Sequence, residues 1–541
     1  MIERMPFLLN LRFQLQRLQW LTASLIAGLA AAAVIAATAG VQVAHAQMRS
    51  GGVDHLPALG EASVDELSPA AEQRLGDQIY QEFLRAGVIH DDPEVTDYLT
   101  KQASRLLDAA TLLGHSEAGR PFQFFVVKDP TLNAFALPGG YIGVHTGLIT
   151  ASPRESEIMS VLAHEIGHVT QRHIARMFGQ QRQSSAVMIA AALLAALAAQ
   201  ASPDAAMGVL SLGQTMAIRE QLAFSRDAER EADRVGLQIL AASGFDPHGM
   251  SSMFERLGQA GRLYDNNAPA YLRTHPLSSE RVADMQNRLQ TDPQLRLSGR
   301  GGAGGPQSIE FGWHRAKLMA LADTRVDGLR NSRLLFEQAL KDPANATPGH
   351  RAPLYFGLAW AAILQRDFPS AQSHIALAQQ EAQQAGVLSE VAPLLMHQQL
   401  RLAIALNDAA MSEKLLAEAK SFAHVRAVTR AMIEAQLNFA MPAEPIVTLA
   451  RNATQKWPQD PQVWALLGRA EAARGHKAAQ HAAFAEQYAL AGAYAAAVDQ
   501  LTLARKAGDA DFMTLSKIDA RLTVMRAALR REQLERQQQQ R

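Results

Sequence analysis

Two histidines four residues apart constrain the fold of this chain more than any other feature. His164 and His168 flank Glu165 in the segment His-Glu-Ile-Gly-His. On an α-helix these histidines project from one face and can bind one ion, while Glu165 lies near enough to act on water there. A catalytic zinc site needs three protein ligands and an open position. The fold therefore has to bring a third ligand to this helix from elsewhere.

That third ligand is an oxygen or a nitrogen, because the chain contains no cysteine. The same absence excludes disulfides and cysteine nucleophiles. The 52 basic and 52 acidic residues give a formal net charge of zero. No global basic field would collect nucleic acid, so we expect no nucleic-acid partner. With 541 residues, the chain is too long for one ordinary core and should form two folded parts.

An acidic helix supplies candidates for the third ligand. We expect it to begin near Ser225, the N-cap, and to end at Gly244 in the left-handed conformation. Glu229 and Asp233 lie four residues apart on one face, whereas Glu231 points roughly the opposite way. Glu229 can bind the metal while Asp233 supports a histidine or assists proton transfer. Spacing alone favours the simpler interpretation that these acids solvate a surface helix.

The helix that carries the two histidines has its own start signal. Ser152 is expected as N-cap, Pro153 as the first helical residue and Glu155 as the partner in a capping box. Upstream, Phe122–Val127 predicts a strand, and residues 133–144 predict a β-hairpin around a glycine-rich turn. A peptide could be held between this hairpin and the metal.

Two further histidines are expected to have other roles. His173 follows His168 by five residues, so on a continuous helix it turns away from the metal face and should be solvated. His145 lies in the strand region, where a structural role is favoured over contact with substrate.

The first 46 residues predict a secretory signal peptide. Three arginines precede an apolar stretch at about residues 21–43, and Ala44-His45-Ala46 forms a small-x-small cleavage site. The alternative is an uncleaved anchor, since the stretch is long enough to span a bilayer. A cysteine-free exported chain suits a bacterial periplasm, where an unpaired thiol risks oxidation. We therefore expect a periplasmic protein.

Composition divides the rest of the chain. We predict a signal peptide at 1–46, a catalytic domain at 47–297, a glycine-rich linker at 298–309, a helical repeat domain at 310–529 and a disordered tail at 530–541. Within the catalytic domain, the apolar residues 186–218 predict a buried or gating helical hairpin in preference to a membrane crossing.

The C-terminal region is helical, alanine-rich and weakly repetitive. The positions that suggest tetratricopeptide-type (TPR) repeats are Ala371, Ile375 and Ala378, which recur as Ala497, Leu501 and Ala504, together with Trp464, Leu467 and Gly468. Small residues at these spacings let paired helices approach closely. The alternative is an ordinary alanine-rich helical bundle.

Three segments together resemble the HtpX and CAAX-prenyl-protease group of gluzincin zinc peptidases. They are His164-Glu165-Ile166-Gly167-His168, Glu229-Arg230-Glu231-Ala232-Asp233 and Asn133-Ala134-Phe135-Ala136. The likeness is specific from about residue 67 to residue 289. It implies an α+β, mainly α, zincin-type metallopeptidase domain with a small β-sheet, followed by an all-α TPR-like domain.

The resemblance also implies roles for individual residues. The family's third zinc ligand corresponds to Glu229, and its proton donor corresponds to Asp233. The family's edge strand, which binds substrate by β-augmentation, corresponds to Asn133, Ala134 and Phe135; the alternative is an ordinary core strand. Glu165 remains the general base, and one Zn²⁺ per chain is expected.

The segment Thr274-His275-Pro276-Leu277 and the repeat domain resemble exported members of this group. There, the histidine that matches His275 closes the open zinc position and holds the enzyme latent, with an arginine that matches Arg281 nearby, and the segment that matches residues 186–218 plugs the active site. On sequence alone, His275 is a loop histidine beside a proline.

The implied function is a periplasmic zinc-dependent endopeptidase that degrades misfolded or stalled outer-membrane β-barrel proteins and assists their assembly. Its repeat domain would dock substrate or the β-barrel assembly machinery, with room for peripheral contact with a membrane. One alternative is a chaperone or assembly adaptor whose metal site stays mostly latent. Another is a metal-free relic.

Overall fold

The computed structural model describes residues 68–116, 119–179, 225–263, 270–293, 295 and 308–539. The predicted signal peptide, the apolar segment 186–218 and most of the glycine-rich linker lie outside these ranges, so those predictions stand as they were made. Every helix within the described ranges is too short or too polar to cross a lipid bilayer.

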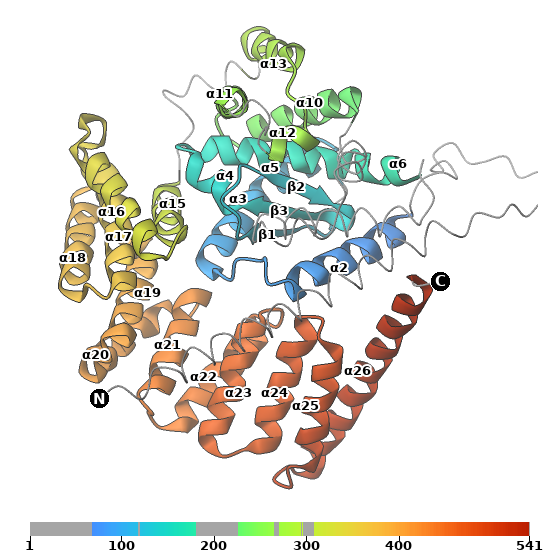
Figure 1. Ribbon diagram of the computed structural model, residues 1–541, viewed down its shortest axis with the longest axis vertical. Helices are drawn as coiled ribbons and strands as arrows, with labels where there is room; N and C mark the ends of the chain where they lie inside the picture. Colours follow the sequence, from blue (N-terminus) through green and yellow to red (C-terminus); the bar gives the residue numbers. More distant parts are fainter. Residues whose placement is uncertain are drawn as a thin grey trace, which may run out of the picture. The chain divides into compact units, whose positions relative to one another are not determined.

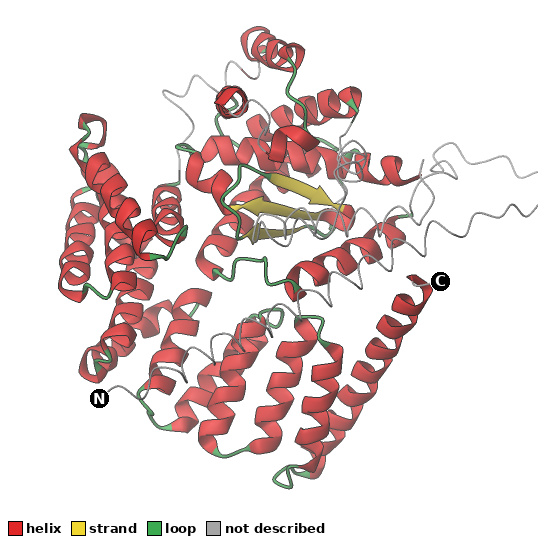
Figure 2. Ribbon diagram, in the orientation of Figure 1, coloured by secondary structure: helices red, strands yellow, loops and turns green. Residues whose placement is uncertain are grey.

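The N-terminal half combines helices with one small sheet, as the sequence predicted (Figures 1 and 2). Its helices are α2 (Pro69–Arg85), α3 (Pro93–Leu112), α4 (Thr146–Ala151), α5 (Glu155–Thr170), α6 (His173–Gly179), α10 (Arg226–Ala242), α11 (His248–Leu263), α12 (Ala270–Thr274) and α13 (Ser279–Thr291). Its strands are β1 (Gln123–Val127), β2 (Ala134–Leu137) and β3 (Tyr141–His145).

The sheet has the order β1-β3-β2, with β1 parallel and β2 antiparallel to β3. The predicted hairpin is present: β2 and β3 are joined by the 3₁₀ turn η1 (Pro138–Gly140), in which Gly139 and Gly140 both have positive φ. Glycine adopts that conformation at little steric cost. β2 is therefore an edge strand of the three-stranded sheet.

Both faces of the sheet are covered. Side chains alternate between faces along a strand, so Phe125 and Phe135, which pair with Gly143 on either side, share one face. The rings of Tyr80 and Phe83 from α2 pack on that face. The opposite face packs against α3 and α5 in the main hydrophobic core. Helix α5 is thereby held against this face of the sheet.

The predicted capping box of α5 is wrong. The helix begins at Glu155, and its N-cap, Arg154, makes no side-chain capping hydrogen bond. Ser152 instead ends the short helix α4, and its hydroxyl donates to the carbonyl of Leu148 at 2.8 Å. Glu155 is buried and accepts hydrogen bonds from Tyr98 and Ser308. The sequence showed a good cap but not the second helix that uses it.

The C-terminal region is helical throughout its described residues. Its helices are α15 (Ile309–Leu321), α16 (Val326–Lys341), α17 (Pro348–Gln365), α18 (Phe368–Gln384), α19 (Leu388–Leu406), α20 (Ala409–Ala419), α21 (Arg426–Asn438), α22 (Ala443–Lys456), α23 (Pro461–Arg474), α24 (Lys477–Leu490), α25 (Tyr494–Lys506) and α26 (Phe512–Gln539), with 3₁₀ turns η2 (Pro343–Asn345) and η3 (Lys420–Phe422).

Consecutive helices of this region pack on one another, as expected for TPR-like repeats. The small residues noted in the sequence lie at these contacts: Ala371, Ile375 and Ala378 of α18 and Ala497, Leu501 and Ala504 of α25 are all buried. A Cβ on Gly468 of α23 would come within 2.6 Å of the ring of Phe484 on α24. Glycine there permits the close approach of this helix pair.

Two features differ from the predicted division of the chain. Helix α15 places Phe311 and Leu318 in the core of the N-terminal half and Trp313 in the first core of the helical region. It therefore belongs to both. In addition, α26 continues to Gln539, where a disordered tail was predicted. Its Arg-, Glu- and Gln-rich end consists of strong helix formers, so low hydrophobicity there did not mean an absence of helix.

Candidate metal centre

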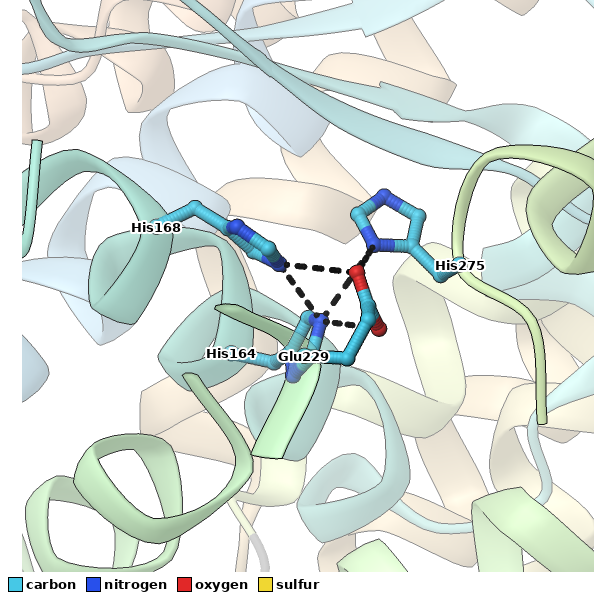
Figure 3. Close-up of side chains that lie close together, drawn as sticks. All are labelled: His164, His168, Glu229 and His275. Carbon is cyan, nitrogen blue, oxygen red and sulfur yellow. Dashed lines mark hydrogen bonds and ion pairs between the residues drawn. The ribbon is translucent and has the colours of Figure 1, made fainter. Parts of the chain in front are cut away.

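Four side chains from three separate segments converge on one point. His164 and His168 come from α5, Glu229 comes from the first turns of α10, and His275 follows α12 (Figure 3). All four are buried, and one ligand atom from each lies within 4.8 Å of the other three. The helical prediction for the first two residues is confirmed, and so is the helix that carries Glu229.

The spacing of these atoms fits a zinc ion. His168 Nε2 lies 3.0 Å from His164 Nε2 and 3.3 Å from Glu229 Oε1. His275 Nδ1 lies 2.9 Å from Glu229 Oε1 and 3.4 Å from His164 Nε2. Tetrahedral zinc with bonds of about 2.0–2.1 Å places neighbouring donors about 3.3–3.4 Å apart. The three nitrogens and one carboxylate are therefore a suitable donor set at a suitable spacing.

Two glycines let α10 approach α5 closely enough to deliver its carboxylates. A Cβ on Gly236 would lie 3.0 Å from the backbone N and Cα of His164. A Cβ on Gly167 would lie 3.0 Å from the carbonyl oxygen of Ala232. Any larger side chain at these positions would push the helices apart. The close crossing sets Glu229 and Asp233 beside the histidines.

Both histidines of α5 use their Nδ1 atoms away from the cluster. Nδ1 of His164 lies 3.0 Å from Oδ1 of Asp233, and Nδ1 of His168 lies 3.0 Å from Nδ1 of His173. A ring that donates through Nδ1–H keeps the lone pair of Nε2. In that tautomer, both Nε2 atoms face the cluster as metal-ligand atoms. Burial holds the pKa of His168 well below its ordinary value, which favours the neutral ring.

Arg281 of α13 binds the two carboxylates of α10. Its guanidinium donates to both oxygens of Asp233, at 2.7 and 2.8 Å, and its Nη1 lies 2.7 Å from Glu229 Oε2. Burial alone would raise the pKa of both carboxyls. His275 and His168 nevertheless hold the pKa of Glu229 well below its ordinary value, and Arg281 and His164 lower that of Asp233. Both groups are therefore ionised at neutral pH.

Glu165 lies in a different environment. It is fully buried, and Nε2 of His275 lies 3.6 Å from its Oε1. Burial raises its pKa above the ordinary value, although His275 and His164 act in the opposite direction. A hydrogen bond from the backbone N–H of Ala136 in β2 also acts to lower this pKa. A carboxyl with a raised pKa beside the edge strand is suited to take up and return a proton.

His275 is the residue whose place the sequence alone could not give. It is 1% exposed, and its ring stacks on Tyr271 of α12 with the ring centroids 4.6 Å apart. Burial would lower its pKa, but Glu229 and Glu165 raise the pKa above its ordinary value. The structure thus brings His275 and Arg281 into the same cluster as the residues of α5 and α10.

Three further candidates, His145, Asn133 and His173, lie outside the group of four. His145 has the favoured structural setting: it is buried, its Nδ1 lies 2.9 Å from Oγ1 of Thr131, and its Nε2 lies 3.3 Å from Nδ2 of Asn133. Asn133 precedes the edge strand β2, which contains Ala134 and Phe135. The prediction for His173 is wrong, because this residue is 4% exposed and contacts His168.

Residues 93–289 match the sequence profile of Peptidase family M48. The chain is 31% identical over 499 residues to the β-barrel assembly-enhancing protease of Escherichia coli strain K12, which covers 92% of this chain and 96% of that protein.

Two shorter matches are also to metallopeptidases. The chain is 31% identical over 229 residues to the metalloprotease LoiP of Escherichia coli strain K12, covering 42% of this chain and 83% of that protein. It is 28% identical over 244 residues to the mitochondrial metalloendopeptidase OMA1 of Schizosaccharomyces pombe, covering 44% of this chain and 66% of that protein. The chain therefore belongs to Peptidase family M48 and, with its buried histidine and glutamate cluster, is a metalloprotease.

Proposed function

We propose that this chain is a periplasmic zinc-dependent endopeptidase that acts in outer-membrane protein quality control, where it degrades misfolded or stalled β-barrel proteins and assists their assembly. The observation that carries the proposal is the buried cluster of His164, His168, Glu229 and His275, with Glu165 beside it. One Zn²⁺ per chain fits this donor set.

The protein groups have separate roles in this proposal. His164, His168 and Glu229 hold the ion, which when bound supplies Lewis-acid chemistry and makes water more acidic. Glu165 accepts the proton of the attacking water and passes it to the leaving nitrogen. Asp233 orients His164 through Nδ1 and assists proton transfer, while Arg281 fixes both carboxylates of α10.

The edge strand β2 is the proposed substrate strand. Its hydrogen-bonding edge opposite β3 pairs with no strand among the described residues. Glu165 lies beside its residue Ala136. An extended peptide that added to this edge would pass the general base with its backbone held by main-chain hydrogen bonds. Asn133, Ala134 and Phe135 would form the start of that strand.

The proposed substrates and compartment come from the relatives and the N-terminal sequence. The β-barrel assembly-enhancing protease of Escherichia coli is similar along nearly its whole length, so its named process is the natural proposal for this chain. The predicted signal peptide supports export to the periplasm. The helical region would dock substrate or the β-barrel assembly machinery, as stacked helix pairs commonly do.

Replacement of the general base tests the proposal. Glu165→Gln keeps the size of the side chain but removes its ability to accept a proton at neutral pH. We expect the variant to retain one zinc per chain, measured by elemental analysis, and to lose cleavage of a denatured outer-membrane β-barrel protein by at least 100-fold, as removal of a general base typically does. Unchanged zinc content together with unchanged cleavage would contradict the mechanism.

A second function is favoured by one observation. His275 stands where a fourth ligand would stand, so at rest it would leave no open position for water. This arrangement suits a chaperone or assembly adaptor whose protease is mostly latent. Complementation of a deletion strain separates the two functions: rescue of every defect by Glu165→Gln favours the adaptor, whereas failure of rescue favours the protease.

A further inference from the structure

His173 lies against the metal centre because the chain turns sharply after α5. On a continuous helix, a residue five positions after His168 would be rotated by about 140° from it. Helix α5 instead ends at Thr170, and Arg172 has a φ of 54°, in the left-handed region. Non-glycine residues rarely adopt this conformation, and the surrounding structure has to maintain it. The turn folds His173 back against His168.

The contacts of His173 show where the protons lie in a series of hydrogen bonds that runs from Glu231 through His173 to His168. Its Nε2 lies 3.0 Å from Oε2 of Glu231, which Arg176 also contacts at 3.3 Å. A carboxylate accepts hydrogen bonds, so His173 donates through Nε2–H. A hydrogen bond between two ring nitrogens needs one donor and one acceptor. Nδ1 of His173 then carries a lone pair and accepts the hydrogen bond from Nδ1–H of His168, 3.0 Å away.

This series of hydrogen bonds determines which nitrogen of His168 is available to bind a metal. With its proton on Nδ1, His168 presents the lone pair of Nε2 to the cluster. In the opposite tautomer, Nε2 would carry a proton and could not be a ligand. His164 is oriented by a carboxylate, Asp233, whereas His168 is oriented by the ring of His173, which is itself held by the carboxylate of Glu231.

We propose that His173, supported by Glu231, is a positioning residue that fixes the tautomer and ring orientation of the zinc ligand His168. The proposal rests on the proposed zinc site. It deepens that site by assigning a role to the left-handed turn at Arg172 and to Glu231, the carboxylate of α10 that faces away from the cluster. Groups that orient metal-binding histidines typically contribute about 10–100-fold in metal affinity.

Two replacements of His173 separate the hydrogen bond from the packing. His173→Phe keeps a ring of similar volume but has no acceptor, and we expect zinc affinity to fall about 10–100-fold in competition with a chromogenic chelator. His173→Asn places an amide oxygen near the position of Nδ1, and should recover most of that loss. The visible spectrum of the Co²⁺-substituted protein should change in His173→Phe and return towards wild type in His173→Asn.

Substitutions of two acidic residues on α10, Glu231 and Asp227, provide a second test that changes no residue of the hydrophobic core. Glu231→Ala removes the acceptor of His173 Nε2 and should weaken zinc binding severalfold. Asp227→Ala is the matched control, because Asp227 lies one turn earlier on α10, carries the same charge, is 89% exposed along its side chain and pairs with Arg230. It should bind zinc as the wild type does. Melting temperatures of the zinc-free proteins show whether each variant is folded.

The outcomes distinguish this inference from the function on which it rests. A wild-type chain that binds no zinc would overturn the proposed function. Zinc binding in the wild type with unchanged affinity and Co²⁺ spectrum in folded His173→Phe would overturn the positioning role alone. Equal losses in folded His173→Phe and His173→Asn would overturn the assignment of His173 Nδ1 as the acceptor.

Discussion

Arg281 is the cation on which two buried carboxylates depend. It contacts Glu229 and both oxygens of Asp233, and it is itself only 4% exposed. Asp233 in turn orients His164. A single guanidinium therefore connects a candidate metal ligand with the group that supports another. Arginine suits this position because its planar fork can serve two carboxylates at once.

Removal of Arg281 should destabilise the protein before it affects chemistry. Arg281→Ala leaves two buried carboxylates without their cation, and we expect the free energy of unfolding of the zinc-free protein to fall by about 3–5 kcal/mol in urea denaturation. Arg234→Ala is the control: its side chain is 51% exposed and lies 3.7 Å from Asp284, so the loss should stay below about 1 kcal/mol. Equal stabilities for the two variants would contradict this account.

The position of His275 predicts an effect opposite to that of most active-site replacements. Because His164, His168 and Glu229 remain, His275→Ala should still bind one zinc per chain. It should cleave a denatured β-barrel protein faster than the wild type does, since the fourth position becomes open to water. Zinc content and initial cleavage rates measure the two quantities. Slower cleavage with full zinc content would show that His275 assists catalysis instead of closing the site.

At the scale of elements, the crossing of α5 and α10 builds the centre. The helices meet at Gly167 and Gly236, where a Cβ would lie 3.0 Å from backbone atoms of the other helix. Gly167 lies inside the histidine motif itself, so the motif carries a packing requirement as well as its ligands. The separation of the helices sets the distance between the histidines and Glu229.

A Gly→Ala substitution in a helix normally stabilises a protein, but at this helix crossing we expect it to be destabilising. We expect Gly236→Ala to lower the free energy of unfolding by about 1–3 kcal/mol through overpacking and to weaken zinc binding. Gly258→Ala in α11 is the matched control, since its Cβ would meet Leu277 at 3.9 Å. It should gain up to about 1 kcal/mol from helix propensity. Calorimetry with and without zinc measures both; a gain in both variants would contradict the argument.

At the scale of the molecule, α15 connects the peptidase half with the helical region. Lys317 of α15 is buried, lies 2.8 Å from Asp92 and also pairs with Glu94 at the start of α3. His397 of α19 lies 2.9 Å from Glu94 on its other side. These contacts, and the place of α15 in two hydrophobic cores, couple the stabilities of the two regions.

This buried cluster predicts sensitivity to acid. Burial would raise the pKa of both carboxyls, but Lys317 and His90 lower that of Asp92, and His397 and Lys317 lower that of Glu94. A lowered pKa in the folded state stabilises the protein above the ordinary carboxyl value near 4, and that contribution is lost as the pH falls below it. The wild type should therefore lose stability below about pH 4.

Removal of Lys317 should move that loss to higher pH. In Lys317→Met the two carboxyls lose their cation and protonate more readily, so circular dichroism during acid titration should show unfolding at a higher pH, with about 3–5 kcal/mol less stability at pH 7. Lys101→Met removes an exposed pair with Glu310 between the same two helices and is the control, expected to change stability by less than about 1 kcal/mol. Coincident acid transitions would contradict the role of the cluster.

Features that depend on local spacing could be predicted from the amino-acid sequence. The four-residue separation of His164 and His168, the same separation of Glu229 and Asp233, and the glycine-rich turn of the β-hairpin each predicted an element that the structure contains. The small residues of the helical region likewise mark buried helix contacts. Helix and strand periods and turn chemistry are local properties, so they can be recognised in a single sequence.

Other features of the site and of the fold could not be predicted from local spacing and are seen only in the folded protein. It placed His275 beside Glu229, brought His173 back through the left-handed turn at Arg172, and gave Ser152 to the preceding helix. It also set α15 in two cores at once. Each outcome depends on contacts between segments far apart in the chain, or on a backbone conformation that neighbouring segments maintain. Local patterns contain no information on such contacts, because the free energy that selects them arises only when the core is assembled.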